Sequence, residues 1–103
     1  MKNFIYYIYI IRCENNALYT GITTDLERRF DEHMHSLKGA KFTRANKPQK
    51  LEIAWKTNSR SSASKLEYSI KQLSKSQKEN LISGKETISS IWNNKFDEIQ
   101  IFS

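Results

Sequence analysis

Four side chains have the types that phosphodiester chemistry uses. Hydrolysis of a phosphodiester needs a group that generates the nucleophile, a cation that holds the phosphate and commonly a metal ion that neutralises developing charge. Tyr9 and Tyr19 fall in two apolar runs, and a tyrosine beside a cation or metal can act as a base near neutral pH. Arg29 and Glu67 fall in two later amphipathic segments. Taken singly, each of the four also has an ordinary structural interpretation.

Arg29 follows Leu26 by three residues, on the flank of an apolar stripe, and His33 lies four residues further on the same side. From this position an arginine can lie over a sheet and hold a phosphate. The alternative is that Arg29 and His33 form a solvated helix face, which is the usual fate of an arginine chosen blindly.

Glu67 lies four residues after Ala63 and three before Ile70, beside the apolar stripe of its segment. A carboxylate at such a border can face a cleft and coordinate a hard cation such as Mg²⁺. Ser64 and Glu67 also match a helix capping box, so a capping role or plain exposure stays open.

The elements that must position these side chains follow from apolar periodicity. Residues 4–12 are β-branched and aromatic nearly throughout, which is typical of a strand buried on both faces. Residues 17–22 predict a second strand, paired with the first as a hairpin, in which Gly21 lets another group approach the backbone closely. The sequence from Thr24 to Glu27 matches a capping box and predicts a helix.

The second half of the chain predicts one more strand and two helices. Residues 38–50 contain five basic residues, no acidic one, a glycine and a proline, and predict a loop. Residues 51–57 alternate apolar and polar positions as a strand does, and a helix follows from the serine-rich start at 59–64. A capping box at 74–77 predicts a short helix that Gly84 ends.

The order β-β-α-β-α-α predicts an α/β (α+β) fold with a largely antiparallel sheet. A chain of 103 residues makes one domain, which we expect over 1–84, with 85–103 as an extension packing on it. A stripe at Ile88, Ile91 and Trp92 could form a helix, and residues 99–102 could add a strand.

The net charge of +6 and the pI of about 9.5 favour a polyanionic partner. Cys13 is the only cysteine, which excludes an internal disulfide and a cysteine-based zinc site, and its apolar surroundings predict a buried thiol. The apolar run near the N-terminus stops at Arg12, too short to span a bilayer, and no cleavage site follows it. We therefore expect a cytoplasmic protein without a membrane partner.

In combination these residues resemble the GIY-YIG nuclease superfamily. The motifs that carry the resemblance are Tyr7-Ile8-Tyr9, Tyr19-Thr20-Gly21 ten residues after Tyr9, 24–29 with His33, 39–44 with Pro48, 66–68 and 70–74. They cover roughly residues 4 to 83 and are specific as a set. The chain is most similar in these motifs to the small stand-alone bacterial branch, which is related to the catalytic subunit of structure-specific endonucleases.

The resemblance implies a three-stranded antiparallel sheet flanked by helices. It implies that one of Tyr9 and Tyr19 activates or polarises water while the other lines the phosphate site. Arg29 matches the arginine that holds the scissile phosphate, and Glu67 matches the single carboxylate for one divalent ion, Mg²⁺ or Mn²⁺. His33 joins this candidate catalytic set, and it either supports the residues that contact the phosphate or lies on the surface.

The basic segment supplies candidate contacts to the nucleic acid. Lys38, Lys41 and Arg44 either bind the phosphates that flank the scissile phosphate or are ordinary solvated charges. The resemblance favours DNA over RNA as the partner, and it leaves open a protein partner or a homodimer. Residues 85–103 mix acidic and basic side chains, so we expect them to cover a sheet edge or form a dimer contact rather than bind DNA.

The chain departs from the family pattern at several positions. Tyr7 and Thr20 replace the glycine of the first motif and the isoleucine or valine of the second. Ile22 stands where some members carry a lysine, and Met34 stands where related proteins often carry an asparagine. Two functions therefore remain: a metal-dependent endonuclease acting on branched, damaged or single-stranded DNA, or a non-catalytic or partner-dependent nucleic-acid-binding module with the same fold.

Overall fold

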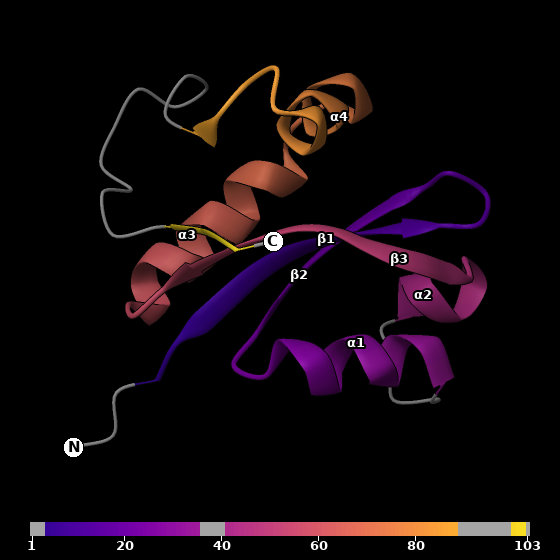
Figure 1. The fold of residues 1–103 in the computed structure, drawn as a ribbon, viewed down its shortest axis with the longest axis horizontal. Helices are drawn as coiled ribbons and strands as arrows, with labels where there is room; N and C mark the ends of the chain where they lie inside the picture. Colours follow the sequence, from indigo (N-terminus) through magenta and orange to yellow (C-terminus); the bar gives the residue numbers. More distant parts are fainter. Residues whose placement is uncertain (1–3, 36–40, 89–99, 103) are drawn as a thin grey trace.

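The computed structural model describes residues 4–35, 41–88 and 100–102. Its sheet is antiparallel throughout, in the order β2-β1-β3-β4 (Figure 1). The strands are β1 (Tyr6–Cys13), β2 (Leu18–Thr23), β3 (Pro48–Thr57) and β4 (Gln100–Phe102). The helices are α1 (Leu26–His35), α2 (Lys41–Ala45), α3 (Arg60–Lys71) and α4 (Lys75–Ser83).

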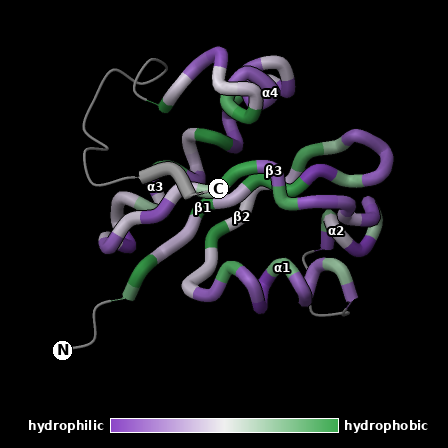
Figure 2. The backbone as a smooth tube through the Cα atoms, in the orientation of Figure 1, coloured by the Kyte–Doolittle hydropathy of each residue, from purple (hydrophilic) through white to green (hydrophobic). Residues whose placement is uncertain are grey.

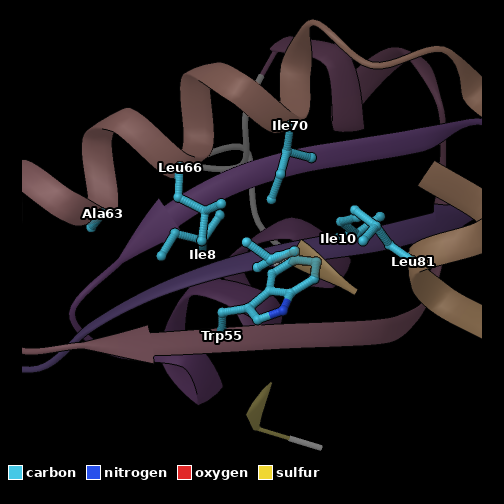
Figure 3. Close-up of a cluster of buried hydrophobic side chains, with 8 residues drawn as sticks. Ile8, Ile10, Trp55, Ala63, Leu66, Ile70 and Leu81 are labelled. Carbon is cyan, nitrogen blue, oxygen red and sulfur yellow. The ribbon is translucent and has the colours of Figure 1, made fainter. Parts of the chain in front are cut away.

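Strand β1 is the centre of the domain, and its alternating side chains serve two cores. Ile8 and Ile10 face α3 and α4, where they pack with Trp55 of β3 (Figure 3). Tyr9 and Ile11 point to the opposite face, which α1 and α2 cover (Figure 1). The prediction of a strand buried on both faces is confirmed, and each of these side chains contributes about 1.5–3 kcal/mol by leaving water.

The hydropathy of the residues follows this arrangement of a central sheet between two layers of helices. Hydrophobic positions extend along the central strands, whereas hydrophilic positions colour much of α1, α2 and α4 (Figure 2). In the part of the chain that the structure describes, no helix combines the length and the apolar composition that crossing a membrane needs. The predicted α+β fold, with helices on both sides of an antiparallel sheet, is confirmed.

Side-chain caps begin three of the helices, and two of them differ from the sequence prediction. Asp25, not Thr24, caps α1, because its Oδ1 accepts a hydrogen bond from the Arg28 N–H at 3.1 Å. Helix α3 is capped by Ser59, so Glu67 lies well inside the helix and the capping interpretation of Glu67 is wrong.

Helix α4 begins and ends as the sequence predicts. Both hydrogen bonds of the capping box between Ser74 and Gln77 form, and Gly84 ends the helix in the left-handed region at φ 82°.

An ion-pair network fixes α4 at one end of the sheet. The Arg12 guanidinium donates to Glu52 of β3 at 2.5 Å and to both carboxylate oxygens of Glu79 of α4, at 2.8 and 2.5 Å. These bonds from Arg12, together with one from Lys75, lower the pKa of Glu79 to about 2. The network joins two strands and a helix through one partly buried arginine.

The loop predicted over 38–50 is wrong in its middle and at its end. Residues 41–45 form α2, because the buried Thr43 anchors this short turn against α1, and β3 begins at Pro48 rather than at residue 51. Proline is tolerated as the first residue of a strand because it need not donate to the ladder. Residues 36–40, including the predicted phosphate contact Lys38, lie outside the described residues.

The C-terminal region is described at 85–88 and 100–102. Ile88 is buried in the core cluster of α3 and α4, and β4 pairs with β3 next to Trp55. The strand that the sequence predicts near residues 99–102 is β4, and it adds a fourth strand to the three that the resemblance implies. The predicted helical stripe at 88–92 falls largely outside the described residues.

Candidate active site

Tyr9 and His33 meet on the face of the sheet that α1 covers. The Tyr9 Oη and His33 Nε2 atoms are 2.9 Å apart, although the residues are 24 positions apart in sequence. Both side chains are buried, with exposures of 1% and 4%. The surface alternative for His33 is therefore wrong.

Thr43 holds the other nitrogen of the His33 ring. Its Oγ1 lies 2.7 Å from His33 Nδ1, and Thr43 is itself only 4% exposed. Sequence reasoning missed this residue because it placed the segment in a solvated loop. A threonine between exposed basic residues was the available signal, since its side chain can turn inward while its neighbours remain in water.

Burial and charge determine the protonation of this pair. Burial first, and then the Arg29 charge, lower the pKa of His33 to about 4, so the ring is neutral at pH 7. Burial and the neighbouring Tyr19 raise the pKa of Tyr9 well above its usual value. The phenol therefore keeps its proton in the free protein.

These protonation states allow a hydrogen-bonded relay from Tyr9 through His33 to Thr43. A neutral imidazole has one acceptor nitrogen, and the O–H of protonated Tyr9 can donate to that nitrogen when it is His33 Nε2. His33 then carries its hydrogen on Nδ1 and donates it to Thr43 Oγ1. A proton leaving Tyr9 has an acceptor already in place.

Gly21 leaves the space that Tyr9 occupies. The β1–β2 register pairs Tyr9 with Gly21, and a Cβ at Gly21 would lie 2.6 Å from Tyr9 Cζ. The close approach predicted at this glycine is thus the approach of the Tyr9 ring. Tyr19, two residues earlier on the same face, has its ring centroid 5.2 Å from that of His33 and 6.3 Å from that of Tyr9.

Arg29 lies at the border between this cluster and solvent. Its side chain is 27% exposed, it pairs with Glu32 at 2.9 Å, and its charge acts on both Tyr9 and His33. A guanidinium has five donors in a planar fork, so one edge can bind a phosphate while other donors stay on the protein. The structure brings Tyr9, Tyr19, Arg29 and His33 together.

Glu67 lies on α3, the helix that packs on the face of the sheet opposite Tyr9. Its carboxylate is 22% exposed, pairs with Lys71 at 3.5 Å, and is near enough to raise the pKa of Tyr9 further. Within residues 4–35, 41–88 and 100–102, no three His, Cys, Asp or Glu side chains group as a metal site would require. A single carboxylate nevertheless suits Mg²⁺, which often takes one or two protein carboxylates and completes its shell with phosphate oxygens and water. Glu67 is the carboxylate that could serve as that one ligand.

The basic residues of α2 border the same cluster. Lys41 and Arg44 are exposed on either side of the buried Thr43. Both charged groups are exposed to solvent, so they can contact phosphate groups of a nucleic acid without any rearrangement of the protein core.

Comparison with known proteins agrees with this arrangement. The model of the GIY-YIG catalytic domain matches residues 5–80, which contain every residue of the cluster. The chain belongs to the GIY-YIG family. The resemblance drawn from its sequence motifs is confirmed.

The relatives of this GIY-YIG protein are of similar size. A UPF0213 protein of Vibrio cholerae serotype O1 is 48% identical over 89 residues, which cover 84% of this chain and 85% of the relative. A UPF0213 protein of Fusobacterium nucleatum is 46% identical over 78 residues, covering 76% and 77% of the two chains. The solution NMR structure of the UPF0213 protein BH0048 from Bacillus halodurans matches with a TM-score of 0.52 and 39% identity, over 90% of this chain and 97% of that one. The names of these relatives state no activity, so they support the family and the fold.

Proposed function

We propose that this GIY-YIG protein is a metal-dependent endonuclease that hydrolyses phosphodiester bonds in DNA. The observation that carries the proposal is the buried hydrogen bond between the Tyr9 hydroxyl and a neutral His33, beside the Arg29 guanidinium. It combines a proton relay with a phosphate-binding cation. Branched, damaged and single-stranded DNA are the candidate substrates.

In the proposed reaction Arg29 holds the non-bridging oxygens of the scissile phosphate. Tyr9 takes a proton from the attacking water as its own proton passes to His33 Nε2, and the hydroxide forms the new bond to phosphorus while the bond to the leaving oxygen breaks. Tyr19 lines the phosphate site. A Mg²⁺ or Mn²⁺ ion held by Glu67 would neutralise charge that develops on the phosphate and the leaving oxygen.

The substrate itself would tune His33 for this step. The positive charge of Arg29 is the second cause of the low pKa of His33. A bound phosphate compensates that charge, so the pKa of His33 rises and the imidazole becomes a better proton acceptor when substrate is present.

The second candidate function is a nucleic-acid-binding module that does not turn over. It is favoured by the pairing of Glu67 with Lys71, which satisfies the carboxylate without a metal. In that case Arg29 and the basic residues of α2 would bind phosphates, and Glu67 would matter little for affinity.

Nicking of a labelled substrate panel tests the proposal. The panel holds duplex, single-stranded, flapped and four-way-branched DNA with a matched RNA strand, each with Mg²⁺, Mn²⁺ or EDTA. We expect cleavage of DNA that requires metal and falls by about 100-fold or more in Glu67→Ala, the scale on which removal of one electrostatic contributor acts. Glu27→Ala, an exposed carboxylate on α1, is the matched control and should cleave as the wild type does.

Each alternative has its own result. If the protein binds DNA but cleaves it no faster than Glu67→Ala does, the endonuclease proposal is wrong and the nucleic-acid-binding module is the remaining function. Cleavage that is equal with EDTA and with metal would contradict metal dependence, and selective cleavage of the RNA strand would contradict DNA as the substrate.

A further inference from the structure

Phe42 extends the aromatic cluster of the site to the protein surface. Its ring stacks on Tyr19, with centroids 5.7 Å apart and planes tilted by 26°. Tyr19 in turn contacts the His33 ring edge-on. Phe42 is 38% exposed, in contrast to the buried Tyr9 at the other end of this series. A large aromatic side chain is therefore partly exposed at the outer edge of the aromatic cluster.

The backbone of Phe42 is held firmly by its neighbours. Thr43, the next residue, is anchored by its 2.7 Å contact with His33 Nδ1. The Phe42 carbonyl accepts hydrogen bonds from the Asn46 N–H at 2.8 Å and from Asn46 Nδ2 at 3.0 Å. These contacts fix the position of the Phe42 backbone in the α2 turn.

The charges around Phe42 indicate which kind of ligand it takes. Lys41 and Arg44 flank it on α2, both exposed, and α2 has no acidic residue. An aromatic side chain between cations is the arrangement with which proteins bind single strands, because bases stack on the ring while the cations contact the phosphates. In a continuous duplex the bases are stacked on one another and are not available to such a ring.

We propose that Phe42 stacks on an unpaired nucleobase adjacent to the phosphate that Arg29 holds. This specificity contact directs the site to single-stranded or locally unpaired DNA in preference to continuous duplex. The inference rests on the proposed function for the position of that phosphate. The stacking itself can be measured by binding, without turnover.

Equilibrium binding in EDTA tests the stacking. The ligands are a single-stranded oligonucleotide containing 2-aminopurine and a blunt duplex of the same length. We expect the wild type to prefer the single strand and to change the 2-aminopurine fluorescence. Phe42→Leu should bind the single strand roughly 5- to 100-fold more weakly, the range measured for loss of one base–aromatic stack, and the duplex almost unchanged. Phe42→Tyr keeps the ring and should bind as the wild type does.

Phe4→Leu is the matched control. Phe4 is 50% exposed at the start of the chain and pairs with Tyr6, outside the Tyr9–Tyr19–His33 cluster. It should leave both affinities and the fluorescence unchanged.

An abasic scan removes the base instead of the ring, so its first result is obtained with the wild-type protein alone. One base at a time is removed from the single strand, and we expect one position at which the wild type loses affinity by the same factor as Phe42→Leu does. At that position Phe42→Leu should show no further loss, because the partner of the missing base is already gone.

Three results would overturn the inference. They are equal single-strand affinities for the wild type and Phe42→Leu, equal losses on single strand and duplex, and an abasic scan without a sensitive position. Failure of the proposed function is a separate outcome, in which no substrate is cleaved while the Phe42-dependent preference persists. Conversely, if cleavage depends on Glu67 but substitution of Phe42 has no effect, the stacking inference is wrong and the proposed endonuclease function stands.

Discussion

At the scale of single residues, His33 shows how tertiary burial determines chemistry. Its sequence position, four residues after Arg29, is equally consistent with a surface residue and with support for the site. In the fold its two ring nitrogens contact Tyr9 and Thr43, and its imidazole is 4% exposed. The neutral ring and the protonated Tyr9 are consequences of that burial, and helix phase alone could not predict them.

The low pKa of His33 predicts how stability depends on pH. The pKa is about 4 in the fold, against about 6.5 in the unfolded chain. Between pH 6.5 and pH 4 the unfolded chain therefore binds a proton that the folded protein does not, so the free energy of unfolding falls as the pH falls through this window. We expect denaturant titrations at pH 7, 5.5 and 4.5 to show this decline, with a shallower one in His33→Gln.

NMR titration of the His33 ring gives the direct measurement. We expect a midpoint near pH 4 in the free protein and a higher midpoint with a bound oligonucleotide, whose phosphates offset the Arg29 charge. An identical pH dependence of stability in wild type and His33→Gln would contradict the assignment.

At the scale of elements, the β2–α3 interface contains a polar position that the packing does not satisfy. Thr20 pairs with Ile10 in the β1–β2 register and is 3% exposed. Its neighbours on that face, Leu18 and Ile22, pack on the core cluster of α3. Among the described residues, the Thr20 hydroxyl has no hydrogen-bond partner. The family motif has an apolar residue here, and the buried environment explains that preference.

Replacing Thr20 with valine should stabilise the protein. Valine has nearly the same shape, keeps the β-branch that strands favour and removes the unpaired hydroxyl, so we expect the free energy of unfolding to rise by about 1–2 kcal/mol. Thr57→Val is the matched control: Thr57 is equally buried, but its Oγ1 accepts a hydrogen bond from the Ser59 N–H at 3.2 Å. That control should lose about 1 kcal/mol. Denaturant unfolding measures both, and a loss of stability in Thr20→Val would show that the hydroxyl is satisfied.

The helices and strands themselves were largely predictable from the sequence, since apolar periodicity and caps act over a few residues. The capping box at Ser74 and the C-cap at Gly84 formed as predicted. Helix α2 did not follow this rule. Five residues without an apolar stripe carry too little local signal, and tertiary contacts, from Thr43 to His33 and from Phe42 to Tyr19, hold the turn in place.

At the scale of the whole molecule, the net charge of +6 is distributed so that α2 presents cations beside the candidate site. The exposed Lys85 follows α4, which packs on the face of the sheet opposite Tyr9. Only cations that contact phosphates release counterions from the nucleic acid when the complex forms. The salt dependence of binding therefore distinguishes a local phosphate contact from general basicity.

Neutralising single cations measures this distinction. We expect Lys41→Gln and Arg44→Gln each to reduce the slope of log affinity against log salt by about 0.7 for a single strand, the value for one lost phosphate contact. Lys85→Gln removes the same charge and should leave the slope unchanged. Equal changes in the three variants would indicate that only net charge matters.

The sequence by itself determined the α+β class, the strand and helix order, the basic character and the family. These properties depend on local periodicity, composition and motif spacing, which a linear sequence carries in full. It also named Tyr9, Tyr19, Arg29 and His33 as a set. Only the tertiary structure decided how they meet, with His33 buried between Tyr9 and Thr43. Contacts between β1, α1 and α2, together with burial, determine the protonation of His33 and Tyr9 and the exposure of Phe42, and those contacts exist only in the folded chain.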